Sequence, residues 1–105
     1  MAQPRRGEVW LIDLGPAAKV RPCLLLTDFP ADDELALITV VPHTTAVRGN
    51  RWEHGCKKSF LKQGVFHLQQ VQSISIAKLI RRLGVLDGDE MVKIAEMLGK
   101  RLALH

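Results

Sequence analysis

The clearest periodic pattern in this chain is helical, and it lies near the C-terminal end. Five apolar residues occupy positions i, i+3, i+4, i+7 and i+11 on one helix face: Met91, Ile94, Ala95, Leu98 and Leu102. Asp87 precedes this run and Glu90 follows three residues later, which is the spacing of an N-terminal capping box. The sequence therefore predicts one amphipathic helix that begins after Asp87.

Upstream of this helix, the apolar patterns are those of short strands. The segments concerned are residues 8–14, 23–28, 35–42, 50–54 and 64–76, the last of which holds one or two strands. Residues 77–84 fit either a helical turn or a strand. Strands followed by one helix indicate an α+β fold that is mostly β, with a small, strongly bent sheet or barrel.

The composition is that of one globular domain over residues 1–105. Hydrophobic residues make up 47% of the chain and charged residues 25%, an ordinary balance for a folded protein. A core built from 105 residues is thin, so dimerisation would not be surprising. The net charge of +4 favours polyanionic partners such as nucleic acid or anionic lipid, although charge alone does not establish either.

Neither a secreted nor a membrane protein is indicated. The apolar stretch near the N-terminus is short and interrupted by Asp13, unlike a secretory signal. No apolar run approaches the ~18 residues of a membrane span. Cys23 and Cys56 form no disulfide framework, and Cys23 is expected in the core. We therefore expect a cytoplasmic protein with no membrane association.

No metal ion or other cofactor is expected either. The candidate ligands are His43, His54, Cys56 and His67, and their spacing matches none of the close pairs that zinc sites use. The eight glycines form no phosphate-binding loop. No G-x-S-x-G motif marks a serine nucleophile.

Polar side chains mark the ends of two predicted strands. Arg21 precedes Pro22 at the entrance to the second strand, and Thr44 lies just past the end of the third. Adjacent strand ends can converge on one rim, where a guanidinium and a hydroxyl would suit a phosphate. A second interpretation stays open, and the pattern alone favours it: a solvated loop arginine and a turn-forming hydroxyl.

Four segments occur in the order found in the MazF/PemK family, the small RNA-cutting toxins of bacterial toxin–antitoxin systems. They are RRGEVWLIDLGP, RPCLLLTD, VVPHTTAVRG and GVFHLQQVQSISIAKLIRRLGVL. The Arg-Pro before an aliphatic strand and the Pro-x-Thr-Thr at a strand end are the stronger marks when they occur together. The chain resembles this family from about Arg6 to Leu104, nearly its whole length.

The resemblance implies a small SH3-like β-barrel with a C-terminal helix, assembled as a homodimer. It also implies sequence-selective, metal-independent cleavage of single-stranded RNA, usually mRNA and sometimes rRNA or tRNA, which inhibits translation and growth. The family's catalytic arginine and threonine fall on Arg21 and Thr44. A cognate antitoxin would lay a partly disordered acidic segment across the basic RNA groove.

His43 and Thr45 flank Thr44 and are candidate auxiliary residues. Arginine is an awkward general base because its pKa lies above ~12. We therefore hypothesise that His43 takes part in proton transfer, since an imidazole titrates near neutral pH. The alternative is that His43 points away from the rim or stacks on a base.

A further set of residues is expected to bind RNA: Lys19, Arg48, Arg51, Trp52, Lys57, Lys58 and Gln70. The basic members would follow the RNA backbone, with Trp52 or Phe60 as a stacking platform, and the alternative is a solvated basic loop. The first loop, GPAAKVRP, departs from the family because it holds Lys19 and no carboxylate. We therefore expect either a different cleavage sequence or reduced activity.

Two other functions are open: a non-catalytic toxin resembling the gyrase poison CcdB, and a degenerate toxin that binds nucleic acid. CcdB acts through a C-terminal tail that contains tryptophan, whereas the last residues of this chain are KRLALH. The retained Arg21 and Thr44 argue against degeneration. An RNA-cleaving toxin is therefore the favoured interpretation.

Overall fold

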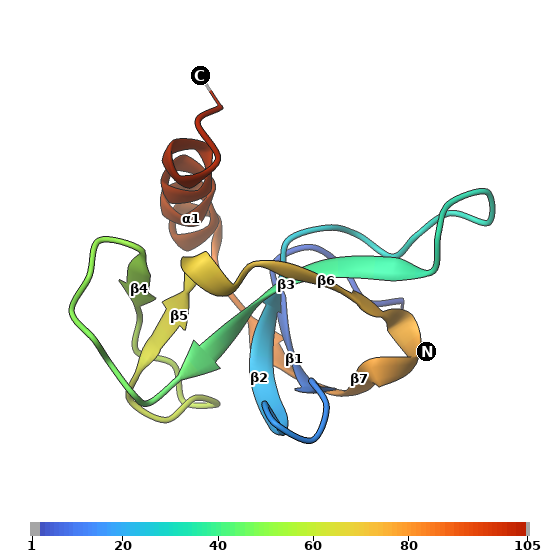
Figure 1. Ribbon diagram of the computed structural model, residues 1–105, viewed down its shortest axis with the longest axis horizontal. Helices are drawn as coiled ribbons and strands as arrows, with labels where there is room; N and C mark the ends of the chain where they lie inside the picture. Colours follow the sequence, from blue (N-terminus) through green and yellow to red (C-terminus); the bar gives the residue numbers. More distant parts are fainter. Residues whose placement is uncertain (1–2, 105) are drawn as a thin grey trace.

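The computed structural model describes residues 3–104, which form a bent antiparallel sheet and one helix (Figure 1). The strands are β1 (Glu8–Asp13), β2 (Val20–Leu25), β3 (Leu37–Thr44), β4 (Glu53–Gly55), β5 (Val65–His67), β6 (Gln72–Ser75) and β7 (Leu79–Val85). The helical segments are the short 3-10 turns η1 (Leu68–Gln70) and η2 (Ile76–Lys78) and the helix α1 (Gly88–Arg101). This is the mostly-β fold with a C-terminal helix that the sequence predicts.

The strands lie in the order β4-β5-β3-β2-β1-β7, and β6 pairs with β3 beside this path. Every pair is antiparallel. The first half of β3 pairs with β6, whereas its last two residues pair with β5. This change of partner accompanies the bend of the sheet seen in Figure 1. Over residues 3–104 no ladder joins β7 to β4, so the barrel is open rather than closed.

The strand boundaries correct the sequence prediction in places that matter for the site. β2 begins at Val20, so Arg21 belongs to the strand and not to the loop before it. Thr44 is the last residue of β3 instead of following it. Residues 64–76 hold two strands separated by η1, and residues 77–84 hold both a helical turn and most of β7.

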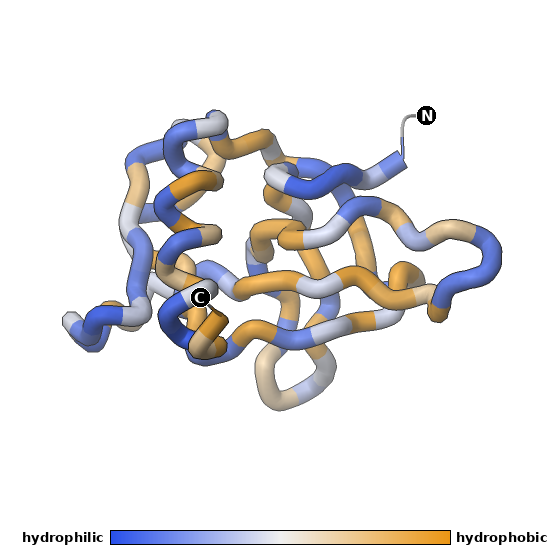
Figure 2. The backbone as a smooth tube through the Cα atoms, turned by 90° about the horizontal axis from the view of Figure 1, so that it is seen from above, coloured by the Kyte–Doolittle hydropathy of each residue, from blue (hydrophilic) through white to orange (hydrophobic). Residues whose placement is uncertain are grey.

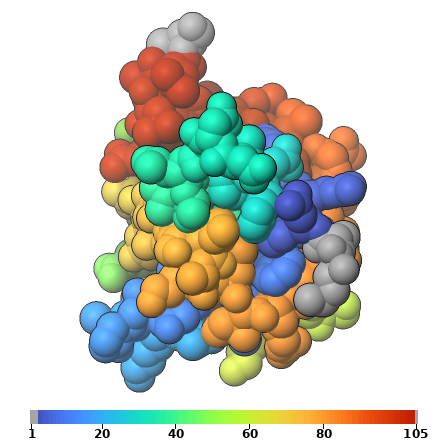
Figure 3. Space-filling model, turned by 90° about the vertical axis from the view of Figure 1, so that its right-hand side faces the viewer, coloured from blue at the N-terminus to red at the C-terminus, as the bar shows by residue number. Residues whose placement is uncertain are grey.

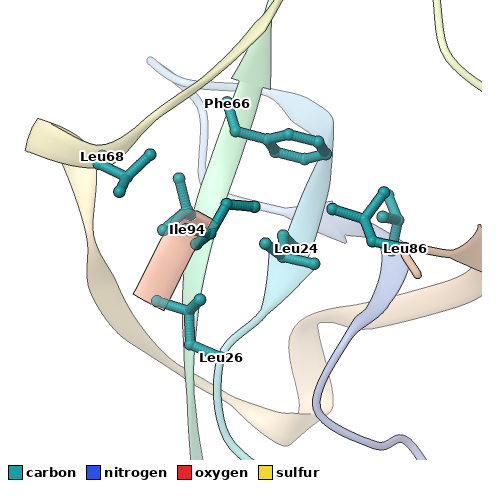
Figure 4. Packing of buried hydrophobic residues seen from close by; sticks show 8 residues of the cluster. Leu24, Leu26, Phe66, Leu68, Leu86 and Ile94 are labelled. Carbon is teal, nitrogen blue, oxygen red and sulfur yellow. The ribbon is translucent and has the colours of Figure 1, made fainter. Parts of the chain in front are cut away.

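The core consists of two clusters of buried residues. The first, shown in part in Figure 4, contains Val9, Leu24, Leu26, Val41, Phe66, Leu68, Leu86 and Ile94. The second contains Ile12, Cys23, Leu25, Ile38 and Val40. Successive residues of β2 alternate between the clusters, with Leu24 in the first and its neighbours Cys23 and Leu25 in the second. Both faces of β2 are therefore buried, which explains its continuous apolar run and confirms the core position of Cys23.

The start of α1 confirms the predicted cap and corrects the predicted capping box. The Asp87 carboxylate accepts a hydrogen bond from the backbone N–H of Glu90 at 2.9 Å. The Glu90 carboxylate does not return to the backbone of Asp87, because it bonds the imidazole of His54 on β4 instead. The helix is thus joined to the sheet through the residue that was expected to complete its cap.

The buried face of α1 is narrower than the apolar pattern predicts. Ile94 is its one fully buried residue among those described, with Met91, Met97 and Leu98 packed around the first core cluster. Ala95 and Leu102, which the pattern placed on the same face, are exposed. Figure 2 shows the resulting alternation of hydrophilic and hydrophobic bands along the helix. No helix within residues 3–104 has the length and hydrophobicity that crossing a bilayer requires.

Candidate active site

The ends of β2 and β3 bring Arg21 and Thr44 together. Cys23 pairs with Pro42, and Arg21 and Thr44 lie two residues beyond this pair on their respective strands. Continuing an antiparallel register in this way places the two residues opposite each other on one face. Both line a hollow of about 660 Å³, which we call the main hollow. The size is within the range of small-ligand sites.

The main hollow combines basic and polar groups with an apolar wall. It is lined by Leu14, Ala17, Ala18, Arg21, Pro42, Thr44, Ala46, Arg48, His67, Gln70, Val71 and Gln72. One side comes from the β1–β2 turn and another from the segment that follows η1, and Figure 3 shows the blue turn beside this gold segment. Two arginines and no carboxylate line the hollow, so it favours an anionic ligand.

The backbone of the β1–β2 turn fixes the side chain of Arg21. Its Nε donates a hydrogen bond to the carbonyl oxygen of Ala18 at 2.8 Å. Among residues 3–104, no carboxylate forms a salt bridge with it. The two terminal nitrogens therefore remain to donate to an anion, in the forked geometry that phosphate oxygens accept.

Thr44 is oriented by the chain that follows it. Its Oγ1 accepts a hydrogen bond from the backbone N–H of Ala46 at 3.0 Å, a local turn that threonine commonly forms. Since this bond uses an acceptor site of the oxygen, the hydroxyl hydrogen remains to be donated. The turn-forming hydroxyl and the ligand-binding hydroxyl were alternatives in the sequence, and one side chain can serve as both.

His43 lies on the opposite face of β3 from Thr44, as strand alternation requires. Its ring is only 4% exposed and packs edge-on against Phe66, with 5.1 Å between the ring centroids. Its Nε2 has no hydrogen-bond partner in the described chain, and burial lowers the pKa of the imidazole. His43 therefore lies outside the main hollow, and its part in proton transfer stays a prediction.

A smaller hollow of about 320 Å³ lies on the other side of the strand ends, and we call it the side hollow. It shares Arg21 and Thr44 with the main hollow and is also bordered by His43 and Thr45. The rest of its lining is Leu11, Pro22, Phe60, Lys62, Arg81 and Leu83. Both candidate auxiliary residues thus lie beside the Arg21–Thr44 pair, but outside the main hollow.

His67 is a residue of the main hollow that the sequence interpretation did not select. Since His43 pairs with Phe66, the next residue of β5, His67, lies on the same face as Thr44. It is 6% exposed, and its Nδ1 has no hydrogen-bond partner within residues 3–104. In the sequence, the signal for this residue was one polar side chain within the apolar run of residues 65–68. A single sequence does not show which strand β5 pairs with, so the signal did not place His67 at the site.

Two of the residues predicted to bind RNA line the main hollow, and a third lies in the turn beside it. Arg48 and Gln70 line it, and Lys19 is exposed in the β1–β2 turn. Lys19 has a φ of 62°, in the left-handed region that glycine or asparagine more often occupies. The turn that covers the hollow therefore holds a basic side chain at a strained position.

The loop that carries Arg48 is held in place by Glu53. The Glu53 carboxylate accepts hydrogen bonds from the backbone N–H groups of Arg48 at 2.8 Å, Gly49 at 2.6 Å and Asn50 at 3.1 Å. These bonds, that from Arg48 above all, lower the pKa of Glu53. The loop after β3 is thus ordered by one carboxylate that does not enter the main hollow.

The other predicted RNA-binding residues lie towards α1. Arg51 and Trp52 border a hollow against this helix, and the Arg51 guanidinium lies 4.4 Å from the centroid of the Trp52 ring. Lys58 forms an ion pair with Asp87 at 3.6 Å, and Lys57 precedes it in the chain. The set predicted as one groove is therefore divided in two. Phe60, the other candidate stacking ring, borders the side hollow.

Comparison with known proteins identifies the family of this chain. Residues 5–102 match the PemK-like, MazF-like toxins of type II toxin–antitoxin systems. The chain is 32% identical over 100 residues to the "Probable endoribonuclease MazF5" of Mycobacterium tuberculosis, covering 92% of this chain and 91% of that protein.

Solved structures show the same fold. The crystal structure of MazF from Deinococcus radiodurans is similar with a TM-score of 0.84 and 19% identity, covering 99% of this chain and 100% of that one. An endoribonuclease from a mycobacterial species, in complex with its cognate antitoxin, is similar with a TM-score of 0.82 and 25% identity, covering 97% of each chain.

The bent antiparallel sheet and the C-terminal helix define a small, mostly-β protein with an open SH3-like barrel and a basic hollow at the strand ends. The family match extends over nearly the whole sequence. The chain belongs to the PemK-like, MazF-like toxins of type II toxin–antitoxin systems.

Proposed function

We propose that this chain is an endoribonuclease that cleaves single-stranded RNA at selected sequences without a metal ion. The observation that carries the proposal is the pair Arg21 and Thr44, whose remaining hydrogen-bond donors are available in one basic hollow. The name of the relative from Mycobacterium tuberculosis supports the same reaction class.

The ribose 2′-OH is the nucleophile in this reaction. It attacks the adjacent phosphorus, the bond from phosphorus to the 5′-oxygen breaks, and the products are a 2′,3′-cyclic phosphate and a 5′-hydroxyl. Negative charge accumulates on the non-bridging oxygens in the transition state, where fixed donors stabilise it most. Arg21 supplies the N–H groups of its two terminal nitrogens and Thr44 supplies one O–H group for these oxygens.

Proton transfer needs a further residue. One proton must leave the 2′-OH and another must reach the departing 5′-oxygen. A guanidinium is an awkward general base, because arginine is effectively always protonated in proteins. His67 is the imidazole that lines the main hollow. We assign to it the removal of the proton from the 2′-OH and the return of a proton to the departing 5′-oxygen. His43 remains the alternative, acting from the side hollow.

The donor groups of the main hollow support a reaction without a metal ion. Magnesium and calcium are held mainly by carboxylate and carbonyl oxygens, and no carboxylate lines this hollow. Zinc needs three or four nitrogen, sulfur or oxygen ligands, whereas His67 is the one imidazole in the lining and no thiol accompanies it.

We also propose the partners and the setting of the reaction. The substrate is mRNA, with rRNA or tRNA as further targets, and its cleavage stops translation. An acidic segment of a cognate antitoxin competes with RNA for the main hollow, because no carboxylate there would repel it. The antitoxin complex of the mycobacterial endoribonuclease supports this assembly. The chain acts in the cytoplasm as a homodimer of domains that each span residues 1–105.

The test is cleavage of a long single-stranded RNA in EDTA. The wild type should give discrete cuts with 2′,3′-cyclic phosphate ends. Arg21→Ala and Thr44→Ala should each lose about 100-fold or more in rate, as when a transition-state donor is removed. Arg82→Ala serves as the matched control, because Arg82 is exposed on β7 and pairs with Glu8. It should cut like the wild type.

Variants of the two histidines extend this test. His67→Gln should slow cleavage and flatten its pH dependence, whereas His43→Gln should leave both closer to the wild type. The reverse result would assign proton transfer to His43. Intact RNA after incubation with the wild type, with RNA binding retained, would contradict the proposed activity and favour a binding module.

A further inference from the structure

A second cluster of reactive side chains lies where β4 meets the first turn of α1. His54, Cys56 and Glu90 each offer one ligand atom there, and these atoms all lie within 4.8 Å of one another. The His54 Nε2 and the Glu90 Oε2 are 2.6 Å apart. None of the three residues lines the main hollow or the side hollow. The proposed RNA cleavage therefore leaves this cluster unexplained.

The backbone holds each of the three residues separately. His54 is in β4, paired with Phe66 of the first core cluster. Cys56 comes two residues after His54, directly after the end of β4, so its side chain starts from the same face as that of His54. The N–H of Glu90 is bound by the cap residue Asp87. Because all three anchors are formed by the fold, the cluster is assembled before any ligand binds.

The three side chains are partly withdrawn from water. The His54 side chain is 10% exposed and that of Glu90 is 21% exposed, and Cys56 packs against the first core cluster. A ligand at their centre would reach solvent on one side only. This arrangement suits a small ion, and it leaves one position for a water molecule.

The ligand atoms point to one kind of ion. An imidazole nitrogen, a thiolate sulfur and a carboxylate oxygen are the donors that zinc binds in proteins. Magnesium and calcium prefer oxygen donors alone, so the thiol argues against them. A thiolate and a carboxylate together would balance the charge of the divalent ion.

The ligand atoms lie within 4.8 Å of one another, and side-chain movements would bring them to the spacing of a tetrahedral site. Bonds from zinc of about 2.0–2.3 Å place its ligand atoms roughly 3.3–3.7 Å apart. The His54 and Glu90 atoms, now 2.6 Å apart, would separate by less than about 1 Å to reach this range. The cluster therefore needs only side-chain adjustments.

A catalytic thiol is a less suitable interpretation of the same residues. Cys56 packs against the first core cluster, and the Glu90 carboxylate lies near its sulfur. Reactive cysteines instead occupy partly exposed, electropositive surroundings, because the thiolate is the nucleophile. A metal ion is the ligand that converts such a thiol to a thiolate by displacing its proton.

We propose that His54, Cys56 and Glu90 bind one zinc ion, with water as the fourth ligand, and that the ion joins β4 to α1. A search of the sequence for the close ligand pairs of zinc motifs could not find this site. Glu90 follows Cys56 by 34 positions and belongs to a different element of the fold. The ion would stabilise the fold without taking part in RNA cleavage.

Cobalt is the probe for this site, because zinc has a filled d shell and gives no visible spectrum. The metal-free full-length protein is titrated with Co²⁺. One equivalent should produce a thiolate-to-cobalt charge-transfer band in the near ultraviolet and the strong visible bands of four-coordinate cobalt. Zinc should abolish both by displacement, and it should raise the Tm in a concentration-dependent way.

Variants assign the ligands. Cys56→Ser should remove the charge-transfer band, while Cys23 stays in place and contributes none. His54→Gln and Glu90→Gln should each weaken the affinity at least tenfold. Glu96→Gln is the matched control, because Glu96 is exposed on the same helix. Circular dichroism without metal establishes that each variant is folded.

Two results would overturn the proposal: no charge-transfer band from the folded wild type, or an unchanged band from Cys56→Ser. Both readouts are independent of RNA cleavage. A protein that binds zinc and cuts no RNA would contradict the proposed function alone, whereas one that cuts RNA and binds no zinc would contradict the zinc site alone.

Discussion

At the scale of single residues, the backbone decides what Arg21 and Thr44 can do. The Nε of Arg21 is occupied by the carbonyl oxygen of Ala18, and an acceptor site of Thr44 by the N–H of Ala46. Free donors remain on both side chains: the two terminal nitrogens of Arg21 and the hydroxyl hydrogen of Thr44. Two residues that are common in loops can thus present donors to an anion, because neighbours in the chain hold their side chains in place.

The buried imidazole of His43 makes stability depend on pH. Burial lowers its pKa in the folded state below the ordinary value of 6.5. As the pH falls below 6.5, the unfolded chain binds more protons than the folded chain. The free energy of unfolding therefore decreases as the pH is lowered, until the pH is below the folded-state pKa. Urea unfolding between pH 7.5 and 5 should show a smaller loss for His43→Gln than for the wild type. Parallel curves would contradict this account.

Gly64 is required by the close approach of β5 to the end of β3. A Cβ at this position would overlap the carbonyl oxygen of Thr44 and lie 2.9 Å from Cε1 of His43. Gly64→Ala should therefore displace Thr44, slow RNA cleavage and lower stability by about 1–3 kcal/mol. Urea unfolding and cleavage rates measure both effects.

Gly88→Ala is the matched control for Gly64→Ala. A Cβ at Gly88 meets nothing within 4 Å, and alanine favours a helix more than glycine does. This variant should keep activity and stability. Wild-type behaviour of Gly64→Ala would show that residues 64 and 44 do not approach as closely as described.

At the scale of elements, sequence patterns predicted what depends on neighbours along the chain. The apolar run of β2 reports burial on both faces, and Asp87 caps α1 as its position indicates. The same patterns overestimated the buried face of α1, because Ala95 has no element packed against it. Periodicity gives the face of a helix, whereas the partner on that face decides how much of it is buried.

Ile94 should be the main anchor of α1. It is 1% exposed and packs in the first core cluster. Ile94→Ala should lower the free energy of unfolding by roughly 2–5 kcal/mol, since it leaves a cavity beneath the helix. Val92 is 57% exposed on the same helix, and Val92→Ala should change stability by less than about 0.5 kcal/mol. Equal effects in urea unfolding would contradict this packing.

At the scale of the whole molecule, the sequence could not predict which residues meet across strands. Arg21 and Thr44 were selected by resemblance to the family, since their position at strand ends did not decide the matter, whereas His67 lies beside them only through the pairing of β5 with β3. Trp52 was expected near the RNA, yet the chain before β4 places it against α1. These positions depend on pairings between distant segments, which local pattern does not determine.

The division of the basic residues predicts how RNA binding responds to salt. Affinity for single-stranded RNA should fall with rising salt, with a slope of about −0.7 for each phosphate that a cation neutralises. Arg48→Ala should reduce this slope, because Arg48 lines the main hollow. Arg51→Ala should change it less, since Arg51 lies over Trp52. A larger effect of Arg51→Ala on the slope than of Arg48→Ala would indicate that RNA also binds the surface around Trp52.

The central claim is that Arg21 and Thr44 act together on one phosphate. The most direct test is the single-turnover cleavage rate of Arg21→Ala, Thr44→Ala and the double variant, with RNA affinity measured alongside. Residues that act as a unit have strongly non-additive effects. The double variant should therefore cut about as slowly as the slower single variant, with affinity largely retained. A single variant that cuts at the wild-type rate, or losses that multiply in the double variant, would contradict the claim.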